Sequence, residues 1–217
     1  KMQLIIISAG HGNRLKKLTG KYPKPALTVN NKQLIEHYLE IAEKLELNPI
    51  VITNYHYVKF FEQFNIPVYE HNNSKEYLDS ILFCKKIVKN DFCVISGDLY
   101  FSNLQELIKF QDSHKEDNYI ASFLYVDNDC FKAKIKHVLN KPRIFVNWDR
   151  GYKQSIPNFS FFNCDIFKYL TYPLYDFANR AIDNNEKINF FKYTSYLKEI
   201  DTIQDFNEIS KKIENEN

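Results

Sequence analysis

Apolar and polar residues follow one another along this chain in short blocks that predict strands and helices in turn. Residues 4–7 form an unbroken apolar run typical of a buried strand, and residues 34–45 carry apolar side chains at helical spacing. The next blocks predict a strand at 49–53, a helix at 56–64 and a strand at 67–70. Because strands that alternate with helices pair through right-handed parallel crossovers, this order predicts a doubly wound sheet.

The pattern continues and then loosens after residue 126. Residues 74–88 are predicted as a helix, and 92–98 as a buried strand that delivers Asp98 at its carboxyl end. Short alternating pieces between residues 127 and 160, such as 143–148, predict a small antiparallel extension. The remaining predicted elements are a helix at 104–110, a strand at 119–126, a strand at 159–162 that returns to the sheet, short helices at 166–170 and 175–182, a strand at 188–193 and a closing helix through residues 209 and 213.

These elements predict a Rossmann-like, doubly wound α/β fold with a mostly parallel sheet and a small antiparallel extension. No interior stretch resembles a linker, so we expect one domain over residues 1–217. Ligands of such sheets bind outside the carboxyl ends of the strands. The functional residues are therefore expected in the loops that follow the strands.

Composition narrows the classes of function. A net charge of +2 lacks the strongly basic face of a nucleic-acid-binding protein, so we expect no nucleic-acid partner. The four cysteines are scattered, which favours reduced thiols over a zinc site or a disulfide framework. No apolar segment approaches the roughly 20 residues that span a bilayer. We therefore expect a cytoplasmic protein that does not associate with a membrane.

The loop after the first strand carries two of the five glycines in the chain, in the run Ala9-Gly10-His11-Gly12-Asn13-Arg14. Because glycine has no Cβ, backbone N–H groups in such a loop can converge on an oxyanion. A dinucleotide-binding loop would have a third glycine, but Leu15 stands there, and an acidic residue would close the second strand, where Thr53 stands. A P-loop would have Gly-Lys-Ser/Thr, which is absent.

Nucleotidyl transfer is the third interpretation of this loop. It needs cations around a triphosphate and carboxylates for Mg²⁺. Arg14 and Lys24 supply the cations, and Asp98 and Asp201 supply the carboxylates. The accompanying residues therefore favour this interpretation over the other two.

A family resemblance rests on these motifs in their order. Ala-Gly-x-Gly-x-Arg-Leu, Pro-Lys-Pro-Ala-Leu at 23–27, Gly97-Asp98 and Ile200-Asp201-Thr202 resemble the nucleotidylyltransferases that activate sugar 1-phosphates and related compounds. The chain length, the stretch at 72–82 and the ending at 199–206 most resemble short bacterial CTP:phosphocholine, phosphonate and phosphoglutamine cytidylyltransferases. The resemblance implies transfer of CMP from CTP to a small phosphorylated acceptor, with Mg²⁺ as cofactor.

The resemblance also implies a role for each site residue. Arg14 neutralises the leaving pyrophosphate, Lys24 bridges the α-phosphate and the acceptor phosphate, and Asp98 and Asp201 hold Mg²⁺. A homodimer is an open alternative for the oligomeric state. The implied nucleotide-binding residues are Ala9, Gly10, His11, Gly12 and Asn13 around the phosphates, with Tyr55, Asn73 and Ser80 assigned to the base by position alone.

The sequence departs from the family pattern at three places. Asn13 stands where Thr or Ser is usual, His11 replaces a residue that is smaller or differently charged, and Pro157-Asn158 replaces a glycine of the sugar enzymes. Asn13 keeps a polar side chain for a phosphate, so these departures concern the acceptor pocket more than the activity. A sugar-1-phosphate enzyme that uses UTP, dTTP or GTP, and a silent nucleotide-binding homologue, remain alternatives.

Several candidate residues also have a structural interpretation. Arg14 and Lys24 fit ordinary surface charges. Asp98 could cap a helix that begins near residue 104, and Asp201 could cap the closing helix. The aromatic residues Trp148, Tyr152 and Phe159 fit either a box for a quaternary ammonium group or part of the core.

Overall fold

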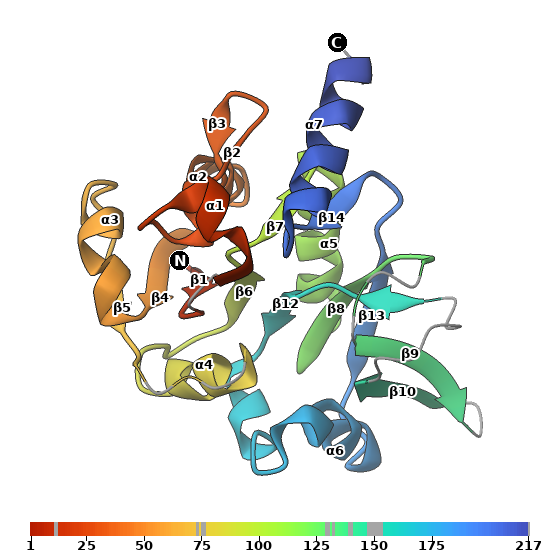
Figure 1. The fold of residues 1–217 in the computed structure, drawn as a ribbon. Coiled ribbons are helices and arrows are strands. Elements are labelled where there is room, and N and C mark those ends of the chain that lie inside the picture. The colour runs from red at the N-terminus through yellow and green to blue at the C-terminus, as the bar shows by residue number, and fades with distance from the viewer. Residues whose placement is uncertain are drawn as a thin grey trace.

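A seven-stranded sheet with helices on both faces forms the centre of the molecule (Figure 1). The computed structural model describes residues 1–10, 13–72, 74, 77–128, 131, 133–138, 141–146 and 154–216. The strand order is β13-β8-β12-β6-β1-β4-β5. These strands are β1 (Gln3–Ser8), β4 (Asn48–Thr53), β5 (Val68–Glu70), β6 (Phe92–Ser96), β8 (Ala121–Tyr125), β12 (Phe159–Phe162) and β13 (Ile188–Lys192).

The pairing of these strands confirms the predicted mostly parallel α/β sheet. β1 pairs in parallel with β4 on one side and with β6 on the other, and β13 pairs in parallel with β8. β12 runs antiparallel to both β6 and β8. In the register of β1 and β6, Ile7 lies opposite Ser96, so the carboxyl ends of these two strands meet at one edge of the sheet.

The two faces of the sheet are covered by different helices. Leu4 and Ile6 of β1 belong to the core cluster that includes residues of α2, α5 and α7, whereas Ile5 and Ile7 belong to the cluster with α4 and α6. Because both faces are buried, residues 4–7 of β1 are all apolar rather than alternating with polar residues. The α-helices are α1 (Lys16–Thr19), α2 (Leu34–Lys44), α3 (Val58–Glu62), α4 (Tyr77–Cys84), α5 (Leu104–Glu116), α6 (Phe177–Asp183) and α7 (Ile203–Glu216), and the 3₁₀-helices span Asn13–Leu15, Lys24–Ala26, Tyr55–Tyr57, Cys164–Lys168 and Leu174–Asp176.

Among the described residues, three small antiparallel sheets accompany the main sheet. β9 pairs with both β10 and β11, which confirms the predicted extension (Figure 1). The pattern predicted neither the pair β7–β14 nor the hairpin β2–β3, because strands of two or three residues are too short to show a period. The bounds are β2 (Thr28–Val29), β3 (Lys32–Gln33), β7 (Leu99–Phe101), β9 (Ala133–Val138), β10 (Lys141–Val146), β11 (Ser155–Ile156) and β14 (Leu197–Glu199).

Helix α5 is longer than the sequence predicts, because it continues to Glu116 rather than ending at residue 110. Its second half turns polar side chains inward, which hides the apolar periodicity. Gln111 donates to the carbonyl of Leu45 at 2.9 Å, and His114 Nδ1 lies 2.8 Å from the hydroxyl of Ser122. These hydrogen bonds satisfy buried polar groups that would otherwise destabilise the fold.

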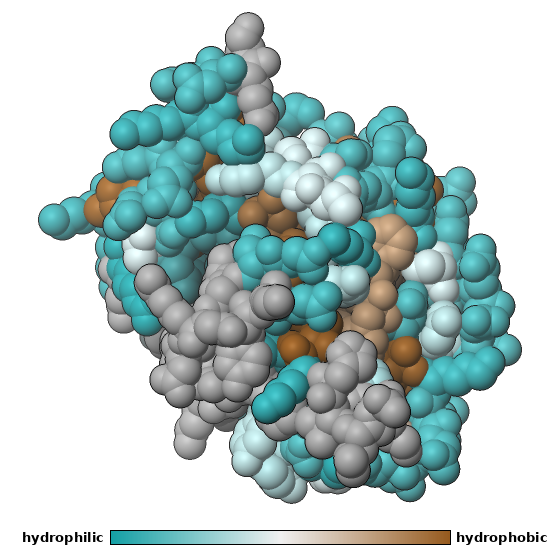
Figure 2. Space-filling model, turned by 90° about the vertical axis from the view of Figure 1, so that its right-hand side faces the viewer, coloured by the Kyte–Doolittle hydropathy of each residue, from teal (hydrophilic) through white to brown (hydrophobic). Residues whose placement is uncertain are grey.

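The described cysteines are free thiols, and the visible surface is mainly hydrophilic (Figure 2). Cys84 and Cys93 are buried free thiols, as the sequence predicts, whereas the free thiol Cys164 is only half-buried. Figure 2 shows a largely hydrophilic face, with hydrophobic side chains visible mainly in a hollow near its centre. Within the described residues, no helix combines the length and apolar character that crossing a bilayer requires.

Replacing Gly97 by alanine should destabilise the fold. A Cβ at this position would lie 2.9 Å from Pro25 Cγ and 3.0 Å from the carbonyl oxygen of Ile7. We expect Gly97→Ala to lower the free energy of unfolding by about 1–3 kcal/mol, measured by urea denaturation. Gly10→Ala is the matched control, since a Cβ there meets nothing within 4 Å. Equal stability of Gly97→Ala and the wild type would contradict this tight approach.

His114 should make the fold sensitive to mild acid. Burial lowers the pKa of His114 to about 4, with a smaller contribution from Lys115. The unfolded chain therefore takes up a proton at a higher pH than the folded chain does. We expect the free energy of unfolding to fall, by up to about 3 kcal/mol, as the pH decreases from about 6.5 to about 4.

The variant His114→Gln isolates this contribution, because glutamine can keep a hydrogen bond to Ser122 but does not titrate. Urea denaturation at pH 7 and at pH 4.5 should show a smaller loss of stability in the variant than in the wild type. If both proteins lose the same free energy, His114 is not the source of the pH dependence.

Candidate active site

A cleft of about 190 Å³ opens where the carboxyl ends of β1 and β6 meet. Ala9 and Gly10 follow β1, and Gly97 and Asp98 follow β6, so the cleft lies where doubly wound sheets bind their ligands. The backbone N–H of Gly97 donates to the carbonyl of Ile7 at 2.8 Å and ties the two strand ends together. The lining residues are Ile7, Ser8, Ala9, Gly10, Lys24, Ser74, Tyr77, Ser96, Gly97 and Asp98.

Lys24 reaches this cleft from a short segment that two prolines hold in place. Pro23 precedes the 3₁₀-helix Lys24–Ala26, and Pro25 falls within its first two residues. Proline fixes its own φ near −65°, which suits the start of a helix. Pro25 is buried and abuts Gly97. The backbone of Lys24 is therefore fixed against the end of β6, while the side chain is directed to the carboxylates.

Asp98 is held by hydrogen bonds at both of its carboxylate oxygens. Ser96 Oγ donates to Oδ1 at 2.6 Å, and Lys24 Nζ donates to Oδ2 at 2.8 Å. The residue is only 9% exposed. Ser96, which the sequence analysis did not single out, fixes the orientation of the carboxylate, so that Oδ2 is the oxygen that points to Lys24.

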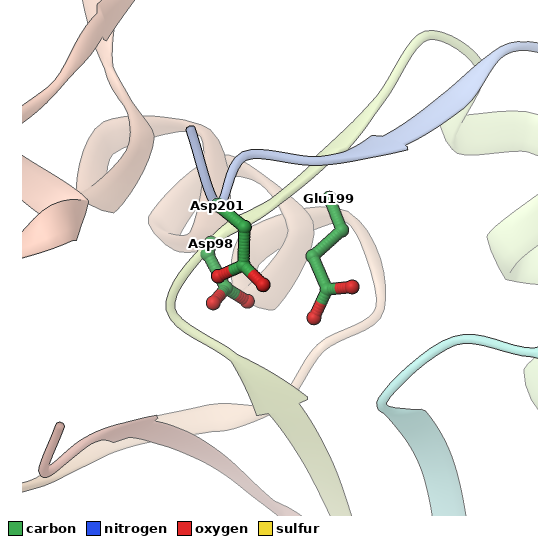
Figure 3. Close-up of side chains that lie close together, drawn as sticks. All are labelled: Asp98, Glu199 and Asp201. Atoms are coloured by element: carbon green, nitrogen blue, oxygen red, sulfur yellow. The ribbon is translucent and has the colours of Figure 1, made fainter. Parts of the chain in front are cut away.

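Asp201 reaches the same place from the far end of the chain. The N–H of Ile200 donates to the carbonyl of Asp98 at 2.8 Å, which continues the pairing of β14 with β7. Lys24 Nζ donates to Asp201 Oδ1, and Arg14 Nη1 lies 3.5 Å from Asp201 Oδ2. Figure 3 shows the carboxylates of Asp98 and Asp201 side by side. The structure therefore brings together all four residues that the sequence assigns to catalysis and metal binding.

Neither aspartate serves as a helix cap, because other residues cap both helices. Asn103 accepts from the N–H of Gln105 at the start of α5. At the start of α7, Asp205 accepts from the N–H of Thr202, whose hydroxyl accepts in return from the N–H of Asp205. The capping interpretation of Asp98 and Asp201 is thus wrong, and both carboxylates instead contact Lys24.

Glu199 is a third carboxylate that the sequence analysis did not assign to the site. One oxygen from each of Asp98, Glu199 and Asp201 lies within 4.8 Å of the others. The side chains of residues 199 and 201 share a face because successive residues of an extended strand alternate, and Ile200 between them is buried. That alternation was the signal in the sequence.

The carboxylates of Asp98 and Asp201 stabilise the charged form of Lys24. Burial acts to lower the pKa of Lys24, but the carboxylates of Asp98 and Asp201 outweigh it, so the pKa of Lys24 lies above its usual value. Lys24 is therefore protonated throughout the neutral range. Its side chain is 21% exposed, so this pair of contacts is only partly screened by water.

The same carboxylates fit a divalent cation. Mg²⁺ prefers hard oxygen ligands, and it is bound in proteins by one or two carboxylates together with phosphate oxygens. Asp98 and Asp201 offer such oxygens beside the cleft, with Glu199 close by. The ammonium group of Lys24 between Asp98 and Asp201 shows that these carboxylates already attract a positive charge.

The predicted phosphate loop is described in part. Ala9 and Gly10 line the cleft. Asn13 begins the 3₁₀-helix that carries Arg14. His11 and Gly12 lie outside the described residues. The assignment of these residues to phosphate binding stays a prediction.

The residues assigned to the base stay predictions as well. Tyr55 is 59% exposed, and its ring centroid lies 3.7 Å from that of His56. Ser80 is fully buried on α4, and its hydroxyl lies 3.0 Å from that of Ser74, a residue of the cleft. Asn73 lies outside the described residues.

Of the three aromatic residues considered as a box for a quaternary ammonium group, the structure describes Phe159, and it does not support that role. This side chain is fully buried and packs against the rings of Phe101 and Phe161 at centroid distances of 5.2 and 5.8 Å. Phe159 is thus part of the core. Trp148 and Tyr152 lie outside the described residues.

Comparison with known proteins shows which family this chain is similar to. The sequence model of the nucleotidyl transferase family matches residues 3–131. The bifunctional protein GlmU of Methanocaldococcus jannaschii is 32% identical over 115 residues, which cover 51% of this chain and 28% of GlmU. The choline-phosphate cytidylyltransferase of Streptococcus pneumoniae is 25% identical over an alignment that covers 100% of both chains.

The chain spans between 28% and 40% of the length of the GlmU relatives from Methanocaldococcus jannaschii and Methanococcus maripaludis. Among solved structures, the UDP-glucose pyrophosphorylase of Acinetobacter baumanii superposes with a TM-score of 0.80 at 13% identity, covering 96% of this chain and 92% of that one. This likeness shows the shared fold. The family match extends over more than half of the chain and includes Gly10, Lys24 and Asp98. This chain therefore belongs to the nucleotidyl transferase family.

Proposed function

We propose that the protein catalyses Mg²⁺-dependent transfer of CMP from CTP to a small phosphorylated acceptor, such as phosphocholine, a phosphonate or phosphoglutamine. The observation that carries this proposal is the contact of Lys24 with both Asp98 and Asp201 at the edge of the cleft. A cation and two carboxylates at this place match the needs of a bound triphosphate and its metal. The family to which the chain belongs supports the same class of reaction.

In the proposed reaction, an oxygen of the acceptor phosphate forms a bond to the α-phosphorus of CTP. The bond from that phosphorus to the β-phosphate oxygen breaks, and pyrophosphate leaves with its electron pair. The attacking phosphate is already ionised at neutral pH, so the protein needs no general base. Catalysis can therefore rest on positioning and on stabilisation of charge.

Different residues bind the phosphates, neutralise their charge and hold the metal. The backbone of residues 10–13 binds the β- and γ-phosphates, and Arg14 neutralises charge on the leaving pyrophosphate. Lys24 contacts the α-phosphate and the acceptor phosphate, and brings their like charges together. Asp98 and Asp201 hold the Mg²⁺, which, when bound, neutralises charge on the phosphate oxygens. Ser96 keeps the carboxylate of Asp98 oriented by its hydrogen bond.

The preference for CTP is drawn from one relative. The choline-phosphate cytidylyltransferase of Streptococcus pneumoniae aligns with this chain over the whole length of both. A sugar-1-phosphate nucleotidylyltransferase that uses UTP, dTTP or GTP is the enzymatic alternative. A silent nucleotide-binding homologue is the alternative without catalysis. The following measurements separate the three.

Thermal unfolding with Mg²⁺ and each of CTP, UTP, dTTP, GTP and ATP identifies the nucleotide. A ligand at a concentration 100 times its Kd stabilises the folded state by about 2.7 kcal/mol, which should raise Tm by roughly 5–10 °C for a chain of this length. We expect CTP to give the largest shift. A larger shift with another nucleotide would favour the sugar-1-phosphate alternative, and no shift with any of them would contradict nucleotide binding.

Replacing Lys24 by methionine should remove most of the turnover. The variant loses the charge that offsets the phosphates in the transition state, so we expect kcat to fall by roughly 10²- to 10³-fold in an assay of pyrophosphate release. Lys198→Met is the matched control, because Lys198 also contacts two carboxylates, Asp205 and Glu208, but does not line the cleft. Turnover of Lys24→Met close to that of the wild type would exclude this role for Lys24.

A further inference from the structure

The two cations proposed to bind phosphate form ion pairs with the two carboxylates proposed to bind the metal. Lys24 and Arg14, which we assign to phosphate, contact Asp98 and Asp201, which we assign to the metal. We propose that Lys24 occupies the place of the divalent cation when no nucleotide is bound, and that it must leave Asp98 and Asp201 for the metal to bind. This inference deepens the proposed function and rests on it for the identity of the two ligands.

The geometry supports competition for the same oxygens. Lys24 Nζ lies 2.8 Å from Asp98 Oδ2 and also donates to Asp201 Oδ1. Ser96 Oγ donates to Asp98 Oδ1, which leaves Oδ2 turned toward Lys24, the position at which a cation would approach. A metal ion that bound Asp98 Oδ2 and Asp201 Oδ1 would lie against the ammonium group. Two positive charges in contact repel, so the two occupants exclude each other.

A bound triphosphate would offer Lys24 another anionic partner. It lines the same cleft as Ala9 and Gly10, where the phosphates are proposed to bind, and its flexible side chain is not fully buried. A bound triphosphate gives the ammonium group an anion in exchange for the two carboxylates. The metal then meets two carboxylates that Lys24 has left, whereas metal alone has to displace Lys24 from them without giving the ammonium group another anion. The exchange therefore couples metal binding to nucleotide binding.

The test measures metal binding without any nucleotide. Mn²⁺ serves as the probe, and the free ion is followed by electron paramagnetic resonance in titrations of wild type, Lys24→Met and Lys198→Met. Removing the competing charge should tighten Mn²⁺ binding by about tenfold or more in Lys24→Met, because close charges interact strongly in a partly buried site. Lys198→Met also exposes two carboxylates and should bind Mn²⁺ as the wild type does.

Adding Asp98→Asn to Lys24→Met should abolish the gain, which locates the ion. If Lys24→Met does not fold, Lys24→Gln, which is also uncharged, should show the same tightening, together with a larger rise in Tm on addition of Mn²⁺ than the wild type shows. An unchanged affinity in the folded Lys24 variant would overturn the proposal, as would an equal gain in Lys198→Met. Because no nucleotide or turnover enters the measurement, failure of the proposed function and failure of this exchange are distinguishable.

Discussion

The contact of one ammonium group with two carboxylates is the interaction on which the site depends. Lys24 is separated from Asp98 by 74 positions in the sequence and from Asp201 by 177. Each would be costly to desolvate alone, and Lys24 together with Arg14, which lies beside Asp201, balances the charge of the two carboxylates at the edge of a cleft. Three distant segments of the chain are thus held at one place by charge as well as by the sheet. The same charges are those that a triphosphate and its metal need.

The backbone brings these three segments together before their side chains meet. β1 and β6 are adjacent parallel strands, so the loops that follow them start from the same edge. Gly97 allows Pro25 to pack directly against the end of β6, which places Lys24 beside Asp98. The pairing of β14 with β7 then sets Asp201 next to Asp98. The site is therefore a consequence of strand order and of one close backbone approach, with the side chains added at the strand ends.

The sequence predicts the main sheet and the central residues because both rest on strong local signals. β1 and β6 each contain an unbroken apolar run of residues, and the motifs that carry Lys24, Asp98 and Asp201, weak one by one, are specific in their order and spacing. The parts that it missed have weak signals. Strands β7 and β14 have three residues each, so the alternation that puts Glu199 and Asp201 on one face was too short to place Glu199 beside Asp98. The end of α5 is hidden by Gln111 and His114, whose polar side chains are buried. Base selectivity leaves no pattern, because it depends on a few contacts that the surrounding fold positions.

The central claim is that Asp98 and Asp201 hold a metal ion while Lys24 and the loop after β1 hold the phosphates. The most direct measurement is a crystal structure with Mn²⁺ and a CTP analogue that resists transfer, using the anomalous signal of manganese to locate the ion. The account predicts an anomalous peak between Asp98 and Asp201, with Lys24 moved onto the phosphates. A peak elsewhere, or a bound nucleotide with Lys24 still between the two carboxylates, would contradict it.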